Sequence, residues 1–134
     1  MACLSAFAQD NVRLTECDKY AGSNYDPRIK DAGVATEKID PKIAIPACLD
    51  AVSHYPQTSR FLYHLGRAYF SSKDYKTSLD YHHKAAEQGD TFAYSALGWM
   101  YQNGFGVTKD LAQAVVLFRK ATEQGNAVCM GEDR

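Results

Sequence analysis

Residues 84–89 read Lys-Ala-Ala-Glu-Gln-Gly, and residues 120–125, 36 positions further on, read Lys-Ala-Thr-Glu-Gln-Gly. Upstream of each copy a Leu-Gly pair is followed by a tyrosine at the same offset, in residues 65–69 and again in residues 97–101. Self-similarity at such a period is typical of stacked helical hairpins, because one hairpin cannot bury its apolar stripe without a neighbour. The sequence therefore predicts an all-α superhelix, a solenoid of antiparallel hairpins, and favours interaction over catalysis.

Composition narrows the classes of partner. The chain has 134 residues and a formal net charge of −1, with acidic and basic residues interspersed. The absence of a basic stripe argues against nucleic acid and against a membrane surface as partners. No apolar run approaches the roughly 20 residues that a membrane span needs. We expect a single domain, without a membrane span, that binds a protein or a peptide.

The first eight residues, Met-Ala-Cys-Leu-Ser-Ala-Phe-Ala, end in a small-x-small pattern before the polar Gln9. This pattern matches the end of a secretory signal whose beginning is missing. An ordinary ragged N-terminus is the alternative. If the segment is a signal remnant, the mature chain begins near Gln9 in an oxidising compartment, that is, a periplasmic or secreted location.

That interpretation predicts the state of each of the four cysteines. In an oxidising compartment Cys17 and Cys48 form a natural pair, and closing this loop of about thirty residues contributes roughly 3–4 kcal/mol. Cys3 would be removed with the signal, and Cys129 would remain a free thiol. No two cysteines have C-x-x-C spacing, which argues against a structural zinc site or a thioredoxin-type redox motif.

The N-terminal part predicts two helices and a long loop. Residues 9–21 read as a short helix, and residues 23–38 as an ordered loop that a Cys17–Cys48 bond would pin. Asp40 and Pro41 provide an N-cap and a first helical residue for a helix to about residue 54. Because Pro46 lacks an N–H, we expect either a kink there or a later start near Ile45.

The repeats predict two complete hairpins. The Leu-Gly glycines, Gly66 and Gly98, lack a Cβ at the expected helix crossings, where Ser78 and Ala114 offer small partners for a close approach. Asp74 is expected to cap one helix of the first hairpin. The expected helices cover residues 60–70, 74–89, 91–102 and 110–124, the last ending at Gly125, and a third unit opens over residues 126–134.

Residues 93–125 carry several motifs of one known repeat in register. They are Leu-Gly-x-x-Tyr at 97–101, Gly-x-Gly-Val at 104–107, Lys-Asp at 109–110 and Lys-Ala-x-x-Gln-Gly at 120–125. This stretch closely resembles a Sel-1-like repeat, a relative of the tetratricopeptide repeat. Residues 60–89 look like a degenerate copy that lacks the glycine loop, and the third unit looks truncated.

The resemblance implies a domain organisation. The N-terminal region is similar to the leading segment of secreted bacterial proteins of this type. The expected parts are a signal remnant at 1–8, a helical cap with a disulfide-pinned loop at 9–58, and repeats at 59–134, divided at about 60–89, 91–125 and a partial 126–134.

No catalytic or metal constellation is recognisable. His82 and His83 are neighbours on a helix, so they point about 100° apart and cannot easily share one metal. His82 falls where the second repeat has Phe118, which predicts a core or groove histidine. The pair Gly104 and Gly106 is too short for a phosphate loop. We therefore expect no enzyme activity, no cofactor and no metal.

The resemblance also implies a binding surface, because in tetratricopeptide-type stacks the first helix of each hairpin lines the concave face. Arg67 and Trp99 occupy equivalent places and are of types enriched among binding hot spots. Alternatively, Trp99 packs against a following repeat. The predicted protein-binding residues are Arg60, Tyr63, Arg67, Trp99 and Gln102, with Phe70, Phe92 and Ser95 on the same face.

Two function classes remain open. The first is a secreted adaptor module that binds a peptide or protein on its concave face. The second is an accessory repeat region of a larger enzyme, since members of this repeat class have been described as hydrolases. Residues 115–117, Val-Val-Leu, cannot all face the preceding unit, so we also expect an exposed apolar edge and self-association.

Overall fold

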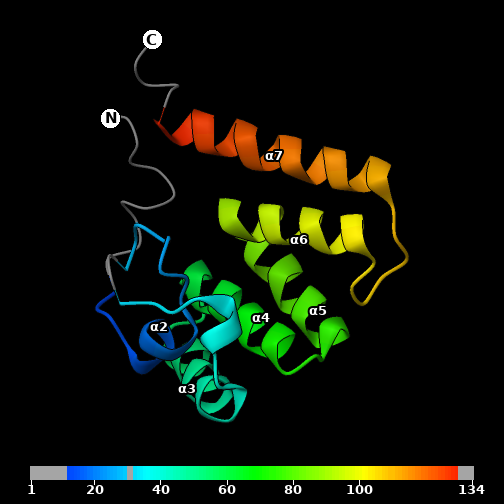
Figure 1. The fold of residues 1–134 in the computed structure, drawn as a ribbon. Helices are drawn as coiled ribbons and strands as arrows, with labels where there is room; N and C mark the ends of the chain where they lie inside the picture. The colour runs from blue at the N-terminus through cyan, green and yellow to red at the C-terminus, as the bar shows by residue number, and fades with distance from the viewer. Residues whose placement is uncertain (1–11, 30–31, 130–134) are drawn as a thin grey trace.

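The computed structural model describes residues 12–29 and 32–129, with side chains up to residue 125, and within them the chain is all-helical, as predicted. Among these residues, the one β-bridge joins Ser23 and Val34. Consecutive helices pack in succession (Figure 1). They are α2 (Glu16–Ala21), the 3-10 turn η2 (Thr36–Lys38), α3 (Pro41–His54), α4 (Ser59–Ser71), α5 (Tyr75–Glu87), α6 (Thr91–Asn103) and α7 (Leu111–Cys129).

Four helices begin at an aspartate whose carboxylate accepts backbone N–H groups left free by the first turn. Asp40 Oδ1 accepts from Lys42 N at 3.1 Å, and Asp90, Asp74 and Asp110 act in the same way on α6, α5 and α7. The starts predicted at Asp40 and Asp74 are thus confirmed. The alternative start of α3 near Ile45 is wrong, and Pro46 lies inside this helix.

The N-terminal helix is shorter than predicted. Residues 12–15 are not helical, and α2 begins only at Glu16. The reason is a capping box, in which the Thr15 hydroxyl accepts from Asp18 N while the Asp18 carboxylate accepts from Thr15 N. This exchange satisfies the first turn at Thr15 and fixes the helix start there. Residues 9–11 lie outside the described part of the chain.

The last helix is longer than predicted. Gly125 does not end α7, which continues to Cys129, so the described residues 126–129 extend this helix rather than open a third unit. A Cβ at Gly125 would meet nothing within 4 Å, so nothing packed against this position interrupts the helix. Residues 130–134 lie outside the described part.

In both hairpins a ring from the second helix covers the glycine of the first. A Cβ at Gly66 would lie 2.5 Å from His82 Cε1, and a Cβ at Gly98 would lie 2.9 Å from Phe118 Cε1. The predicted close approach is confirmed, as is the equivalence of His82 with Phe118. Ser78 strengthens the first crossing by donating from its hydroxyl to the Gly66 carbonyl at 2.7 Å.

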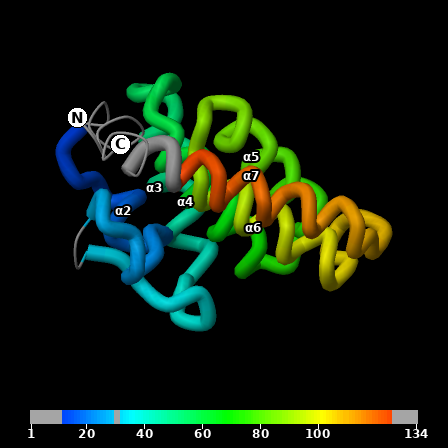
Figure 2. The backbone as a smooth tube through the Cα atoms, turned by 90° about the horizontal axis from the view of Figure 1, so that it is seen from above, coloured from blue at the N-terminus to red at the C-terminus, as the bar shows by residue number. Residues whose placement is uncertain are grey.

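A disulfide joins the N-terminal helix to α3. Cys17 and Cys48 are bonded and fully buried, as predicted for this pair. Around them the core of α2, α3 and α4 includes Ala21, Ala44 and Phe61. In Figures 1 and 2 the blue and cyan N-terminal segment gathers beside α3 and α4, at the opposite end of the molecule from the loop between α6 and α7.

Candidate protein-binding groove

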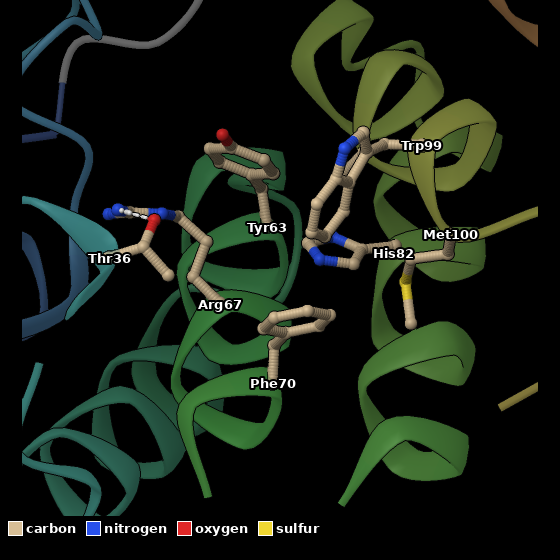
Figure 3. Close-up of a pocket in the computed structure, with 8 residues that line it drawn as sticks. Thr36, Tyr63, Arg67, Phe70, His82, Trp99 and Met100 are labelled. Atoms are coloured by element: carbon tan, nitrogen blue, oxygen red, sulfur yellow. Dashed lines mark hydrogen bonds between the residues drawn. The ribbon is translucent and has the colours of Figure 1, made fainter. Parts of the chain in front are cut away.

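A hollow of about 380 Å³ opens between the first helices of the two hairpins, α4 and α6. Its walls come from four elements, which bring together residues 64 positions apart in the chain. Figure 3 shows the side chains converging on this space. The lining residues are Thr36 from η2, Tyr63, Arg67 and Phe70 from α4, His82 from α5, and Ala96, Trp99 and Met100 from α6.

Aromatic rings form one wall of the groove. The ring centroid of Trp99 lies 5.4 Å from that of Phe70 and 5.0 Å from that of Phe105, and Tyr75 completes the group. Trp99 therefore packs back toward the first repeat and the α6–α7 loop, and its alternative contact with a following repeat stays a prediction. It remains 46 % exposed, which leaves one face available to a partner.

The glycine loop places Phe105 in this wall. Gly104 and Gly106 have φ angles of 75° and 73°, the left-handed region that favours glycine. A Cβ at Gly106 would lie 2.8 Å from the Tyr75 carbonyl oxygen, so the loop can lie against α5 only with glycine there. The motif that carried the family resemblance thus supports one side of the groove.

His82 forms the floor. Burial, followed by repulsion from Arg67 and His83, lowers the pKa of His82 to about 3, so its imidazole is neutral at physiological pH. Its Nδ1 has no hydrogen-bond partner among the described residues. The second repeat has the apolar Phe118 at this place, so the first repeat carries a polar atom where the architecture needs only a ring.

The chain's own N-terminal region packs against α4. Arg67 donates from Nη1 to the carbonyl of Ala21 at 2.7 Å, and from Nη2 to the carbonyl of Val34 and the hydroxyl of Thr36 at 3.2 and 2.9 Å. The guanidinium thus holds both the last residue of α2 and residues 34 and 36 of the segment that follows, about a dozen residues further on. Its side chain extends from α4 to Thr36 of η2, which also lines the groove (Figure 3).

A second arginine, on the covering segment itself, reaches the repeats. Arg28 bonds Asp26 on its own loop and donates to Asp90 Oδ2 at 2.6 Å. Its guanidinium carbon also lies 5.9 Å from the ring centroid of Tyr63 and 5.0 Å from that of Phe92. Because both carboxylates surround it, the pKa of Arg28 is raised even though burial alone would lower it.

Further along α4, Arg60 and His64 share one buried carboxylate. Arg60 Nε donates to Asp18 Oδ1 at 2.8 Å, and His64 Nε2 lies 3.1 Å from the same oxygen. Burial raises the pKa of Asp18, but hydrogen bonds from these two residues outweigh burial and hold it well below the ordinary value. Burial lowers the pKa of His64 despite Asp18, so the site joins one cation, one anion and a neutral ring.

The structure separates the five predicted binding residues into two groups. Tyr63, Arg67 and Trp99 line the groove, whereas Arg60 and Gln102 do not. A partner cannot reach three of the five freely, because only 1 % of Arg60, 8 % of Arg67 and 9 % of Tyr63 is exposed. They are covered because the N-terminal region lies on α4. Gln102 is exposed on α6, away from the groove.

Sequence reasoning missed several groove residues. Thr36 lies in what read as a loop, and Met100 is an ordinary core position by its pattern. Ala96 could have been found, because aligning the Leu-Gly pairs places it opposite His64 of the first repeat. A small residue there leaves space that the histidine fills in the other unit, and this space is part of the groove.

Two kinds of feature are absent from the described residues, a metal-binding cluster and a membrane-spanning helix. No group of three or more His, Cys, Asp and Glu in residues 12–29 and 32–129 could hold a metal ion. In the same part of the chain no helix has the length and apolar character that crossing a membrane requires.

Comparison with known proteins gives one match. A family model described as Sel1 repeat matches residues 59–90 and 91–126, which coincide with the two hairpins. No curated protein and no solved structure matches the chain significantly.

Proposed function

Because the chain belongs to the Sel1 repeat family, whose repeats are non-catalytic and generally mediate protein interactions, we propose that it binds a partner polypeptide in the groove between α4 and α6. The proposal assigns the predicted interaction function to this groove. The groove joins the two repeats, so both must be folded and stacked for it to exist.

The observation that carries this proposal is the way α4 already holds a polypeptide segment. Arg67 binds backbone carbonyls at residues 21 and 34, and Tyr63 lies against the guanidinium of Arg28. These are contacts that recognise a peptide chain, made here to the protein's own N-terminal region. The neighbouring groove continues the same surface onto α6, where the chain covers less of it and Trp99 is half exposed.

The composition of the groove supports the same conclusion. Binding sites in proteins are concave and mostly apolar, with a few polar groups that fix orientation. Here Phe70, Ala96, Trp99 and Met100 supply apolar surface, and the polar groups are few. An exposed tryptophan beside a hollow is a typical anchor for a partner. Truncating such a side chain commonly weakens binding by about 2 kcal/mol or more.

A groove-filling substitution tests the proposal. Ala96→Phe adds a ring in the groove without removing any hydrogen bond, and Ala47→Phe, in a surface hollow beside α3, is the matched control. The parent protein and Ala47→Phe should both capture a partner from an extract of the source compartment. Ala96→Phe should bind that partner at least about tenfold more weakly. Equal binding by both variants would overturn the groove as the site.

Trp99→Ala gives a second, independent reading. It should weaken the same partner about tenfold with little change in helicity, because Trp99 is half exposed. Arg67→Ala does not serve here, contrary to expectation from the sequence. It would remove three hydrogen bonds to the N-terminal region and so change the fold as well as the surface.

We further propose an oxidising location, periplasmic or secreted, for a bacterial protein of this type. The buried Cys17–Cys48 bond supports it, since such bonds persist mainly outside the reducing cytosol. Cys3 lies outside the described residues, so its removal with a signal remains part of the proposal. Thiol counting on the denatured, non-reduced mature protein should find one free thiol, from Cys129, whereas three would contradict the bond.

Self-association through α7 is a subsidiary proposal. Leu117 is buried, but Leu111, Val115, Val116 and Phe118 are exposed, so α7 presents an apolar outer face. Sedimentation should show reversible association that a Val115→Lys substitution weakens, and a monomer at high concentration would contradict it. No observation favours the alternative function, an accessory region of a larger hydrolase. A catalytic domain elsewhere in the full reading frame would support that alternative.

A further inference from the structure

The groove contains a cation without a counter-charge. Arg67 makes three hydrogen bonds, all to neutral oxygens, although a guanidinium carries five N–H donors. No carboxylate in the described part of the chain forms an ion pair with it. Burial lowers the pKa of Arg67, and attraction from Tyr63, Asp26 and Glu37 does not offset it. The guanidinium of Arg67 is thus removed from water without an acidic side chain to pair with.

Other buried cations of the described chain are treated differently. Arg28 has Asp26 and Asp90, and Arg60 has Asp18. Arg67 is therefore the exception among three arginines on the same surface, and it is the one that lines the open groove. An arginine without a carboxylate partner, located at the groove, points to a ligand that supplies the negative charge.

The remaining lining residues add no competing charge. None of the eight is Asp, Glu or Lys, and the imidazole of His82 is neutral. The unpartnered Nδ1 of His82, buried beneath the groove, is a second polar group that the fold leaves unsatisfied. The walls formed by Tyr63, Phe70 and Trp99 suit an apolar side chain.

From these contacts we infer that the groove selects an acidic peptide segment. One apolar side chain of the segment enters between Tyr63 and Trp99, and a nearby carboxylate pairs with the free donors of Arg67. A peptide fits better than a free anion because most of the lining is apolar and the groove continues the surface that already holds residues 22–38. This inference rests on the proposed function and adds the chemistry of the partner.

The energetics favour a carboxylate over an amide or an amine. A bond from a guanidinium to an amide oxygen is already assisted by the charge of the cation, but a carboxylate adds the attraction between opposite charges and can accept two parallel N–H bonds. A lysine in the same place would bring two cations together in a site of low dielectric. Selection should therefore run from Glu through Gln to Lys when the apolar residue is held constant.

The protein carries its own reporter for this test. Trp99 is its single tryptophan and forms a half-exposed wall of the groove, so its fluorescence responds to an occupant. The probes are capped hexapeptides with one Leu or Phe in a Gly-Ser background, and with Glu, Gln or Lys one to three positions away. Glu peptides should bind about tenfold tighter than the matched Gln peptides, and added salt should reduce this preference.

Variants locate the effect. Ala96→Phe should abolish the response to every peptide, and Ala47→Phe should retain it. Arg67→Gln should reduce the Glu over Gln preference to about one while apolar binding persists. Because Arg67→Gln can loosen the N-terminal segment, circular dichroism checks its fold. The preference itself is measured in the unaltered protein, so the inference does not depend on this variant.

Each contrary outcome has a definite meaning. Equal affinity for Glu and Gln peptides overturns the acidic selection and leaves the proposed function standing. A response that survives in Ala96→Phe places the peptide elsewhere and overturns the inference. Failure of all peptides also overturns it, while partner capture by the parent protein and Ala47→Phe still tests the proposed function separately.

Discussion

The two repeats share one scaffold and differ in what lies against the first helix of each hairpin. Arg60, His64 and Arg67 of the first repeat are buried beneath the N-terminal region and bonded to it. The equivalent residues of the second repeat are Phe92, Ala96 and Trp99, none of which is fully buried. Hairpins of the same architecture thus form a closed interface or an open one according to a few side chains and the segment that they hold.

The largest effect should come from the carboxylate that holds the first repeat closed. Asp18→Ala leaves Arg60 and His64 buried without their shared acceptor, and removing one partner of a buried ion pair costs about 3–5 kcal/mol. Urea unfolding measures the loss. Asp50→Ala removes an exposed carboxylate beside His54 and serves as the control, with little change expected. Similar curves for both variants would show that the buried pair contributes little.

The disulfide should have the next largest effect. Replacing Cys17 and Cys48 by alanine releases the N-terminal region from α3, and a closed loop of this length stabilises by about 3 kcal/mol. The double variant should unfold at lower urea concentration, and protease should cut residues 22–38 before the second repeat. Unchanged susceptibility of this segment would mean that Arg28 and Arg67 hold it without the bond.

His82 should make the stability of the first repeat depend on pH. Its folded-state pKa of about 3 lies below the ordinary 6.5, so the unfolded chain takes up the proton first. The corresponding stability is present above pH 6.5 and is lost as the pH falls toward 3, by up to about 1.4 kcal/mol per pH unit. His82→Phe, which copies Phe118 of the second repeat, should remove this loss.

The measurement is urea unfolding of both proteins at several pH values above about 4.5, where carboxyl groups stay ionised. The groups that act on His82 through charge, Arg67 and His83, are the same in both. The advantage of His82→Phe should therefore grow as the pH falls. A constant difference between the two proteins would show that His82 is already hydrated in the folded state.

The smallest effect compares the two helix crossings. Gly66→Ala places a Cβ 2.5 Å from the buried ring of His82, and overpacking of this kind costs about 1–3 kcal/mol. Gly98→Ala meets Phe118 at 2.9 Å, but that ring is partly exposed and can move. The gain of about 1 kcal/mol in helix propensity should leave Gly98→Ala near neutral. Thermal melts that rank the two in the opposite order would contradict this difference between the repeats.

Local rules explain why much of the fold was predictable from sequence. The Leu-Gly pairs, the aspartate caps and the glycine loop act over a few residues, so the hairpins could be placed within one or two positions. The pairing of Cys17 with Cys48 followed from counting cysteines in a presumed oxidising compartment. The errors at α2 and α7 were also local, since a Thr15 cap and a tolerated Gly125 moved helix ends.

The groove could be predicted only in part. The sequence identified the face that carries Tyr63, Arg67 and Trp99, because equivalent repeat positions share one side of a helix. It could not show that Arg60 is buried, since the carboxylate that binds it lies 42 positions earlier. Arg28 and Asp90, which tie the N-terminal segment to α6, are 62 positions apart and have no shared motif.

The sequence by itself determined a stack of two helical hairpins with a disulfide-linked N-terminal region, because periodicity, caps and cysteines constrain the chain locally. Which part of α4 and α6 is open to a partner depends on the tertiary structure. That outcome depends on the 22–38 segment lying across α4 but not across the groove beside Ala96 and Trp99. Burial is a property of segments that meet in space, and side-chain periodicity carries no information about a segment forty residues away.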